Sequence, residues 1–310
     1  MLSNQSGRVF GGRPVSIQVQ SILYNNDADA VERALASIAR SAELALFERV
    51  CTEVIVLYGD CSPMPCLSDE MLAALREKYA NAVTIRYEFF GANLGSARGH
   101  NRLGAQCGSD FLLIQNPDVV ASPRLLETLL DPFSRPDVGM TEAKQLPIEH
   151  PKEYDPVTGE TGWAATASAM IPLAVFEQLS GFDADSFFLY CDDVDFSWRV
   201  RLAGYKVIFQ PAAVVFHDKR LSESGGWQPT SSERYYSAEA AMILSYKWSR
   251  PEIAETIRQE FEDVGDEHQK RAAAEFERRR DNSLLPPRVD GDHKIGYFKD
   301  YFYSKHRYAL

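Results

Sequence analysis

Three carboxylates fall within four positions of this 310-residue chain, at Asp192, Asp193 and Asp195. They repel one another unless a cation, a helix amino terminus or an arginine offsets them, and the sequence supplies a helix start and Arg199. On that helix Asp192 and Asp195 share one face, while Asp193 points about 100° away. One carboxylate can therefore face a substrate while another pairs with Arg199. An acidic first helical turn with an internal ion pair is an equally good interpretation.

A second polar group, Asn116 and Asp118, follows the apolar run 111–114. Because this run has no polar alternation, it is typical of a strand in the middle of a sheet that is covered on both faces. A carboxylate where such a strand ends can hold a divalent cation against a diphosphate, or it can simply cap the next helix. His217 also follows an apolar run, and it becomes a candidate metal ligand only beside other ligands.

Glycines and other small residues mark a strand-to-helix junction between Gly91 and Gly104. Such residues let the phosphates or ribose of a ligand approach the backbone, or they serve tight packing of a helix on a sheet. The junction lacks the Gly-x-Gly-x-x-Gly spacing of dinucleotide sites. The chain also lacks a Walker-type Gly-Lys-Ser/Thr, a Gly-x-Ser-x-Gly elbow and a His-Glu-x-x-His motif, so the sequence does not predict the sites that these motifs form.

Alternating strand and helix patterns must position these groups. The strand patterns cover residues 15–24, 54–57, 83–89 and 111–114, and the helix patterns between them cover 29–46, 69–79 and 94–107. This repetition predicts an α/β fold with a doubly wound parallel sheet, whose ligands bind beyond the carboxyl ends of its strands. Asn25, Asp60 and Asp118 would then meet at one edge of the sheet.

The second half of the chain is less regular. We expect residues 131–161, which are rich in proline and charge, to form a long excursion near the site or over the surface. Further strand patterns cover 164–170, 205–209 and 214–216, and further helix patterns cover 124–130, 172–179 and 192–203.

The composition divides the chain into three parts. Residues 1–14 are predicted to be a flexible leader, 15–250 the main domain, and 251–310 a C-terminal helical and aromatic extension. The stretch 251–280 is highly charged with sparse apolar positions, which is typical of an appended helix. Residues 297–308 are aromatic and basic. They could contact a membrane surface, form a homo-oligomer contact or pack onto the main domain.

The charge balance limits the possible partners. Forty-four acidic residues against 33 basic ones give a net charge of −11, which argues against nucleic acid as a partner. No apolar run approaches the roughly 18–20 residues of a membrane span, and no signal peptide is visible, so we expect a cytoplasmic protein. The five cysteines are odd in number and lack metal-ligand spacing, which predicts ordinary reduced thiols.

The order of these motifs resembles the inverting glycosyltransferases of family 2, which have a GT-A fold with a mostly parallel central sheet flanked by helices. The similarity runs from about Val15 to Trp248. The matching elements are Asn25-Asn26, Gly59-Asp60-Cys61-Ser62, Asn93-Leu94-Gly95 through Asn101, Asn116-Pro117-Asp118-Val119, Gly181-Phe182-Asp183, Phe187-Phe188-Leu189-Tyr190, Asp192–Asp195 with Arg199, Ala203-Gly204-Tyr205 and His217. The Asn116-Pro117-Asp118 sequence and His217, the last of these motifs, are most similar to the rhamnosyl- and galactofuranosyltransferase-type members.

The resemblance implies a metal-dependent inverting enzyme that moves a sugar from a UDP- or dTDP-sugar to a hydroxyl of a glycan or lipid-linked acceptor. It implies that Asp118 coordinates Mg²⁺ or Mn²⁺ on the donor diphosphate and that His217 completes the metal site. Asp193 would be the general base that takes the proton of the acceptor hydroxyl. Asp192 would shape the acceptor pocket, and Asp60 would read the pyrimidine base.

The same resemblance adds further donor-binding residues, Asn25, Asn93, Asn101 and Asn116. Trp163 offers a stacking face for the acceptor sugar, although tryptophans of this kind more often belong to the core.

Three positions depart from the family pattern. The family often has Glu where Asp192 stands, and Cys61 follows Asp60 where an acid or amide is usual, which affects how the base is recognised. Asn116 replaces the first acid of the usual metal motif, so Asp118 and His217 must carry more of the coordination.

Two other functions fit a similar sheet. A sugar-nucleotide pyrophosphorylase would need a glycine-rich loop with Arg and Lys after the first strand, and residues 24–27 offer neither. A non-catalytic carbohydrate- or nucleotide-binding protein of the same fold differs from an enzyme only in activity.

Overall fold

The computed structural model describes residues 13–217 and 229–304 of the chain. Most of the predicted leader, residues 1–12, lies outside the described residues. So do residues 305–308 of the aromatic and basic end. The division into three parts therefore stays a prediction at both ends.

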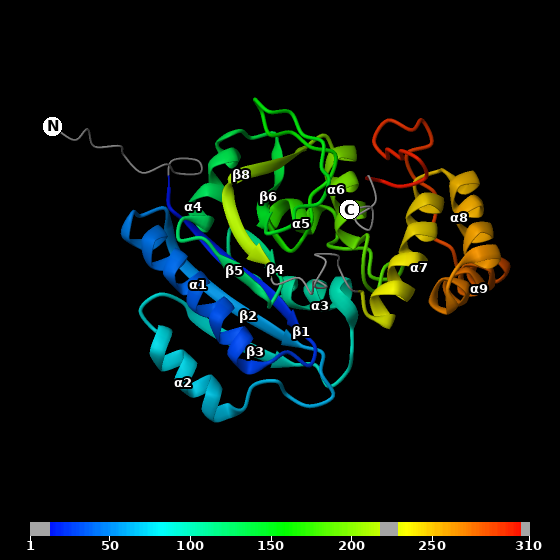
Figure 1. The fold of residues 1–310 in the computed structure, drawn as a ribbon. Coiled ribbons are helices and arrows are strands. Elements are labelled where there is room, and N and C mark those ends of the chain that lie inside the picture. The colour runs from blue at the N-terminus through cyan, green and yellow to red at the C-terminus, as the bar shows by residue number, and fades with distance from the viewer. Residues whose placement is uncertain (1–12, 218–228, 305–310) are drawn as a thin grey trace.

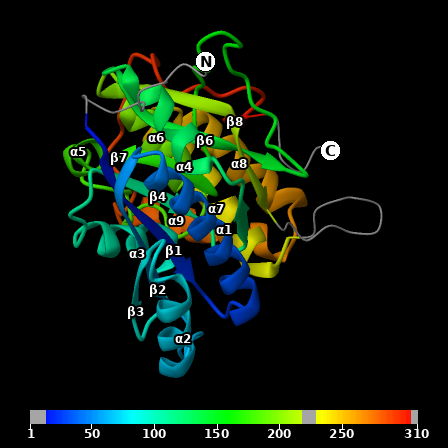
Figure 2. The ribbon, with the colours of Figure 1, turned by 90° about the vertical axis from the view of Figure 1, so that its left-hand side faces the viewer.

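The first half of the chain alternates strands and helices as predicted. Its elements are β1 (Val15–Leu23), α1 (Ala28–Phe47), β2 (Cys51–Asp60), α2 (Asp69–Tyr79), β3 (Thr84–Phe89), α3 (Gly95–Gly104) and β4 (Phe111–Gln115). β1 lies between β2 and β4, β3 flanks β2, and all four strands are parallel. Figure 2 shows β1, β2 and β3 side by side, away from β6 and β8. The ends of β1, β2 and β4 therefore meet at one edge.

The second half completes a mixed sheet. Its elements are β5 (Val119–Ala121), α4 (Leu125–Leu130), the 3₁₀ turn η1 (Asp131–Ser134), β6 (Val138–Leu146), β7 (Ser168–Pro172), α5 (Leu173–Gln178), α6 (Asp192–Leu202) and β8 (Lys206–His217). In the described residues the strand order is β3-β2-β1-β4-β7-β6-β8-β5. β8 is parallel to β6, whereas β7 and β5 are antiparallel to their neighbours. The fold is thus α/β with a mostly parallel sheet flanked by helices.

One expectation is wrong: residues 138–146, which we expected in an irregular excursion, form the buried strand β6. Two of its buried polar side chains, Thr141 and Glu142, have partners outside the strand. The Thr141 hydroxyl donates to the carbonyl oxygen of Leu129 at 2.9 Å, and the Glu142 carboxylate pairs with the Lys152 ammonium, both almost fully buried. Polar residues satisfied in this way hide the apolar pattern that identifies a strand.

Three helices pack together after the sheet. They are α7 (Ser231–Lys247), α8 (Pro251–Val264) and α9 (Glu267–Asp281), and Figure 1 shows them on the side of the molecule opposite α1 and α2. The single helix expected over 251–280 is therefore two, separated at Gly265, with Asp266 capping α9 through the backbone N–H groups of His268 and Gln269. An apolar cluster that includes Trp198, Met242 and Phe276 joins these helices to α6.

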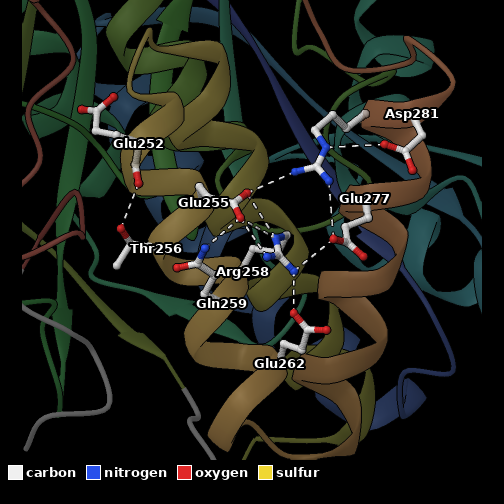
Figure 3. A network of polar contacts seen from close by, with 9 residues as sticks. Glu252, Glu255, Thr256, Arg258, Gln259, Glu262, Glu277 and Asp281 are labelled. Carbon is white, nitrogen blue, oxygen red and sulfur yellow. Dashed lines mark hydrogen bonds and ion pairs between the residues drawn. The ribbon is translucent and has the colours of Figure 1, made fainter.

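Ion pairs connect α8 to α9. The Arg258 guanidinium, 9% exposed, lies 2.8 Å from Glu255, 2.7 Å from Glu262 and 3.1 Å from Glu277 (Figure 3). Arg280 adds a contact to Glu255 at 3.1 Å. The charges that make this stretch look polar in sequence therefore hold the two helices to each other.

The end of α7 is tied to the start of α6. The Lys247 ammonium lies 2.7 Å from both Asp183 and Asp195, and the Trp248 indole N–H donates to Asp195 at 3.0 Å. α7 thus connects the sheet domain to the helices beyond residue 250. None of the helices in the described part of the chain is long and apolar enough to cross a membrane.

Candidate functional site

Strand pairing brings Asp118 and His217 together. β5 and β8 pair antiparallel, and Val119 lies opposite His217. The Asp118 Oδ1 atom is consequently 3.4 Å from the His217 Nε2 atom. The Asp118 side chain is 42% exposed and that of His217 is 14% exposed, so the pair opens to solvent on the carboxylate side.

Gln145 orients the His217 ring. The His217 Nδ1 atom lies 2.9 Å from the Gln145 Oε1 atom, and the Gln145 backbone N–H donates to the Glu149 carboxylate at 2.6 Å. The Gln145 amide oxygen accepts a hydrogen bond when Nδ1 carries the proton, and the Nε2 atom faces Asp118. Sequence reasoning missed Gln145 because it lies at the end of β6, in the expected excursion.

The Asp118 and His217 pair fits a divalent cation. When Nδ1 carries the ring proton, the neutral Nε2 atom and the carboxylate oxygen, 3.4 Å apart, are both available to one cation. Oxygen and imidazole donors suit Mn²⁺, and oxygen donors suit Mg²⁺. No third His, Cys, Asp or Glu in residues 13–217 and 229–304 converges on them, so water and the donor diphosphate would complete the coordination.

A strained turn presents the acidic start of α6. Tyr190 and Cys191 both have positive φ, at 69° and 55°, which is costly for residues other than glycine. Asp192 follows, 4% exposed, with its Oδ2 atom unpartnered among the described residues. Burial and the neighbouring Asp193 raise the pKa of Asp192, against a hydrogen bond from Ser96.

The other two carboxylates of the cluster have different surroundings. Asp195 is fully buried and pairs with Arg199 at 2.8 Å, which confirms the expectation that one carboxylate is tied to this arginine. Asp193 is partly buried, and its Oδ1 atom accepts the Val194 N–H at 2.8 Å. Charge compensation within the cluster is therefore concentrated on Asp195.

Gly95 lets α3 meet the turn before α6. A Cβ atom at Gly95 would lie 2.3 Å from the Phe188 carbonyl oxygen, and its φ is +70°. The same carbonyl accepts the Ser96 N–H at 3.0 Å. Since α3 follows β3, this contact and the hydrogen bond between Ser96 and Asp192 place the start of α6 beside the start of α3.

No family model matches the chain. An N-acetylglucosaminyl-diphospho-decaprenol L-rhamnosyltransferase of Mycobacterium tuberculosis, the same in two strains, is 26% identical over 278 residues, with 74% of this chain and 85% of the relative covered. The rhamnosyltransferase WbbL of Escherichia coli is 33% identical over 79 residues, 24% of this chain and 30% of that protein. The structure of the mannosyltransferase PcManGT from Pyrobaculum calidifontis, in complex with GDP-Man and Mn²⁺, superposes with a TM-score of 0.53 at 16% identity, covering 91% and 84% of the two chains.

The relatives are named as rhamnosyltransferases, and the solved structure agrees with the fold. The chain is a glycosyltransferase. Its fold is GT-A. These findings favour a transferase over the pyrophosphorylase and over the non-catalytic binding protein.

Asp60 of this glycosyltransferase is committed to its own loop. It is fully buried, and its oxygens accept the N–H groups of Ser62 at 2.8 Å and Cys66 at 2.7 Å, together with the Tyr87 hydroxyl. Burial alone would raise the pKa of Asp60, but these hydrogen bonds outweigh it and lower the pKa. In this structure Asp60 shapes the loop after β2, and its contact with a pyrimidine base stays a prediction.

Two of the predicted asparagines bind backbone groups through their side chains, and a third, Asn25, is held through its own backbone N–H. The Asn101 amide donates to the Phe182 carbonyl oxygen at 2.7 Å and accepts the Phe182 N–H at 2.8 Å, which fixes the loop before α6 to α3. Asn93 accepts the Gly95 N–H at 3.1 Å, and the Asn25 N–H donates to Ser62 at 2.8 Å. In the glycosyltransferase these three residues shape the loops at the sheet edge, and their contact with the donor stays a prediction.

Asn116 and Trp163 occupy different places. Asn116, half-buried, lies at the edge beside Asp118, and its N–H donates to the Ala167 carbonyl oxygen at 3.0 Å. Trp163 is 6% exposed, with the Lys152 ammonium 4.0 Å from its ring centroid and the Tyr303 ring 5.1 Å away. This burial favours the core interpretation of Trp163, and its acceptor role in the glycosyltransferase stays a prediction.

Proposed function

We propose that this glycosyltransferase transfers a rhamnosyl group, with inversion, from a nucleoside-diphosphate donor to a hydroxyl of a lipid-linked saccharide diphosphate. The names of the two similar rhamnosyltransferases support the sugar, and one of them names a diphospho-decaprenol acceptor. The observation that carries the proposal is the strand register that brings Asp118 within 3.4 Å of His217.

The reaction needs a base at the acceptor hydroxyl. Asp193 accepts the hydroxyl proton while the hydroxyl oxygen bonds to the anomeric carbon and the bond from that carbon to the diphosphate oxygen breaks with its electron pair. Proton removal of this kind contributes about 10²–10⁴ in rate. Burial and the neighbouring Asp193 raise the pKa of Asp192, which favours the protonated form of Asp192 beside the proposed base.

Asp118 and His217 would hold Mg²⁺ or Mn²⁺ at the sheet edge. The cation, when bound, offsets the charge that develops on the departing diphosphate. Gln145 keeps the His217 Nε2 atom available by accepting a hydrogen bond from the Nδ1–H group.

Transfer assays test the proposal. Purified protein is incubated with UDP- and dTDP-linked sugars, including rhamnose, and with a short-chain polyprenyl diphosphate saccharide, with and without EDTA. We expect transfer from a rhamnosyl donor with Mn²⁺ and none in EDTA. A matching donor at about 100 times its Kd would stabilise the protein by about 2.7 kcal/mol. Full turnover in excess EDTA would contradict the metal site, and turnover only with another sugar would contradict the donor.

Two Gln145 variants test the metal site without activity. Gln145→Leu removes the acceptor for the His217 Nδ1 proton and should weaken Mn²⁺ binding by about 10-fold or more, whereas Gln145→Glu keeps an acceptor and should bind at least as tightly as wild type. Electron paramagnetic resonance of free Mn²⁺ measures both. Equal affinities for the Leu variant and wild type would contradict the orienting role.

The role of the C-terminal extension at a membrane or in a homo-oligomer stays a prediction. Flotation with anionic liposomes, comparing the intact chain with one ending near Ser283, tests the membrane contact.

A further inference from the structure

A cavity of about 600 Å³ lies between α6, residues 151–163 and residues 293–304. Its volume is within the range of small-ligand sites. Neither Asp118 nor Asp193 lines it. The C-terminal segment supplies much of its wall, so the aromatic and basic stretch that the proposed function leaves unused helps to form it.

The wall of this cavity is held in place by hydrogen bonds. The Asp290 carboxylate accepts the N–H groups of Lys294 at 2.9 Å, Ile295 at 2.9 Å and Gly296 at 2.8 Å. The Val289 N–H donates to the Lys247 carbonyl oxygen at 2.7 Å, which anchors the segment to the end of α7. A preformed wall costs a ligand little ordering entropy.

Arg201 lies in the last turn of α6 and lines the cavity. Its Nη1 atom donates to the carbonyl oxygens of Ile295 at 3.2 Å and Gly162 at 3.4 Å, and no described carboxylate lies within 4.0 Å of its guanidinium. Burial lowers the pKa of Arg201, and the more distant Glu160 and Asp290 oppose this effect. A partly desolvated guanidinium with no carboxylate in direct contact is stabilised by an anion.

The lining is cationic in an acidic protein. Lys152, Arg201, Lys294 and Lys299 line the cavity with a single carboxylate, Glu153, although the whole chain has a net charge of −11. The three lysines each have a carboxylate partner at Glu142, Asp292 or Glu153. The charge balance and the unpaired guanidinium therefore both favour an anionic ligand with its anion at Arg201.

Aromatic rings complete the cavity. Tyr297 is 60% exposed, and Tyr303 packs edge-on against Trp163 at 5.1 Å between ring centroids. Exposed aromatic rings offer an apolar face to the C–H groups of a sugar and a polar tip to its hydroxyls. Rings beside a cation thus match a saccharide that carries a negative group.

We infer that this cavity binds the phosphate of a glycosyl phosphate or diphosphate through Arg201, with the sugar against Tyr297 and Tyr303. Arg201 follows Asp193 by eight residues on one helix, about 12 Å along its axis. This separation is comparable to the length of a monosaccharide diphosphate, so the diphosphate of the acceptor is one source of the ligand. That source rests on the proposed function, whereas the site itself does not.

Calorimetry on the full chain tests the site. Inorganic pyrophosphate and N-acetylglucosamine 1-phosphate are titrated in EDTA, which keeps divalent cations away from Asp118. We expect both probes to bind, Arg201→Gln to weaken them at least tenfold, and Tyr297→Ala and Lys299→Glu to weaken them severalfold. The last two side chains are 60% and 42% exposed, so these variants should fold even where Arg201→Gln does not.

Two controls locate the binding. Lys270→Glu changes the charge equally on the exposed surface of α9 and should leave affinity unchanged. Asp118→Asn should also leave it unchanged, because the donor site is not involved. Absent binding to wild type, unchanged binding in the Tyr297 and Lys299 variants, or loss of binding in Asp118→Asn would each overturn the inference.

Acceptor kinetics identify the source of the ligand. A higher KM for the lipid-linked acceptor in Lys299→Glu, with kcat unchanged, indicates the acceptor diphosphate. An unchanged KM with weakened probe binding indicates a free phosphorylated saccharide, and both results support the site. If transfer is never observed while the probes bind as expected, the proposed function fails and the site stands.

Discussion

Carboxylates gather in two parts of the molecule, the start of α6 and the α8–α9 pair, and their surroundings differ. Around Arg258, the carboxylates of Glu255, Glu262 and Glu277 share one buried guanidinium at an otherwise solvated interface. At the start of α6, Asp192 is buried with an unpartnered oxygen. Offset charges hold helices together, whereas a buried carboxyl oxygen left without a partner marks a place where a substrate can complete the set.

The pKa values of the two regions shift in opposite directions. Hydrogen bonds from Arg278 and Arg279 lower the pKa of Glu275 to about 2. Burial and Asp193 raise the pKa of Asp192. The same chemical group is thus ionised over a wide pH range in α9 and kept closer to neutral in α6.

The largest expected effect separates the two regions by activity. Asp193→Asn should lower transfer at least about 100-fold with donor binding intact, because base removal acts on the transition state. Glu262→Gln removes the same charge from α8 and should leave transfer unchanged. Steady-state kinetics with a thermal-shift assay for donor binding measure both, and wild-type transfer by Asp193→Asn would refute the role of this base.

Removing one positively charged side chain from each region compares how much that side chain stabilises the fold. Lys247→Met leaves the fully buried Asp195 with one charge partner fewer, and we expect a loss of about 2–3 kcal/mol in the free energy of unfolding. Arg258→Met affects carboxylates that are 37–63% exposed, so about 1 kcal/mol or less is expected. Urea denaturation measures both, and equal losses would contradict the contrast.

The pH dependence of stability should have opposite signs in the two regions. The raised pKa of Asp192 means that folding stability falls as pH rises above its ordinary value of 3.8, so Asp192→Asn should gain melting temperature relative to wild type at pH 8. The lowered pKa of Glu275 stabilises the fold above 4.5 and loses this effect as pH falls toward 2.

Glu275→Gln should therefore be less stable than wild type at pH 7 and approach it near pH 3. Melting temperatures of the three proteins between pH 3 and pH 8 test this pair. Parallel curves for the two variants would contradict the opposite shifts.

The smallest effect is expected at the rim of the α8–α9 network. Arg280 is 43% exposed, and its contacts to Glu255 and Glu277 are open to water. Arg280→Gln should change the free energy of unfolding by about 0.5 kcal/mol or less. A loss as large as that of Lys247→Met would show that the network is more than an exposed interface.

Local patterns predicted the first half of the fold well. The helix expected over 69–79 has these same bounds, and the strand exits at Asp60 and Asp118 lie at one edge. β6 was missed because Thr141 and Glu142 are buried through partners that are distant in sequence. The sequence identified the motif residues themselves. It could not show that Asn101 and Asp60 bind backbone groups, because this depends on which loop packs against each of them.

The Trp248 indole that reaches Asp195 has a consequence for protein engineering. A shortened enzyme that ends before α7 would lack Lys247 and Trp248. Both donate to the fully buried carboxylate of Asp195 in the first turn of α6. The end of α7 thus supports the start of α6. Attempts to exchange the helices α7–α9 between related enzymes as an independent module should carry Lys247, Trp248 and Asp195 together.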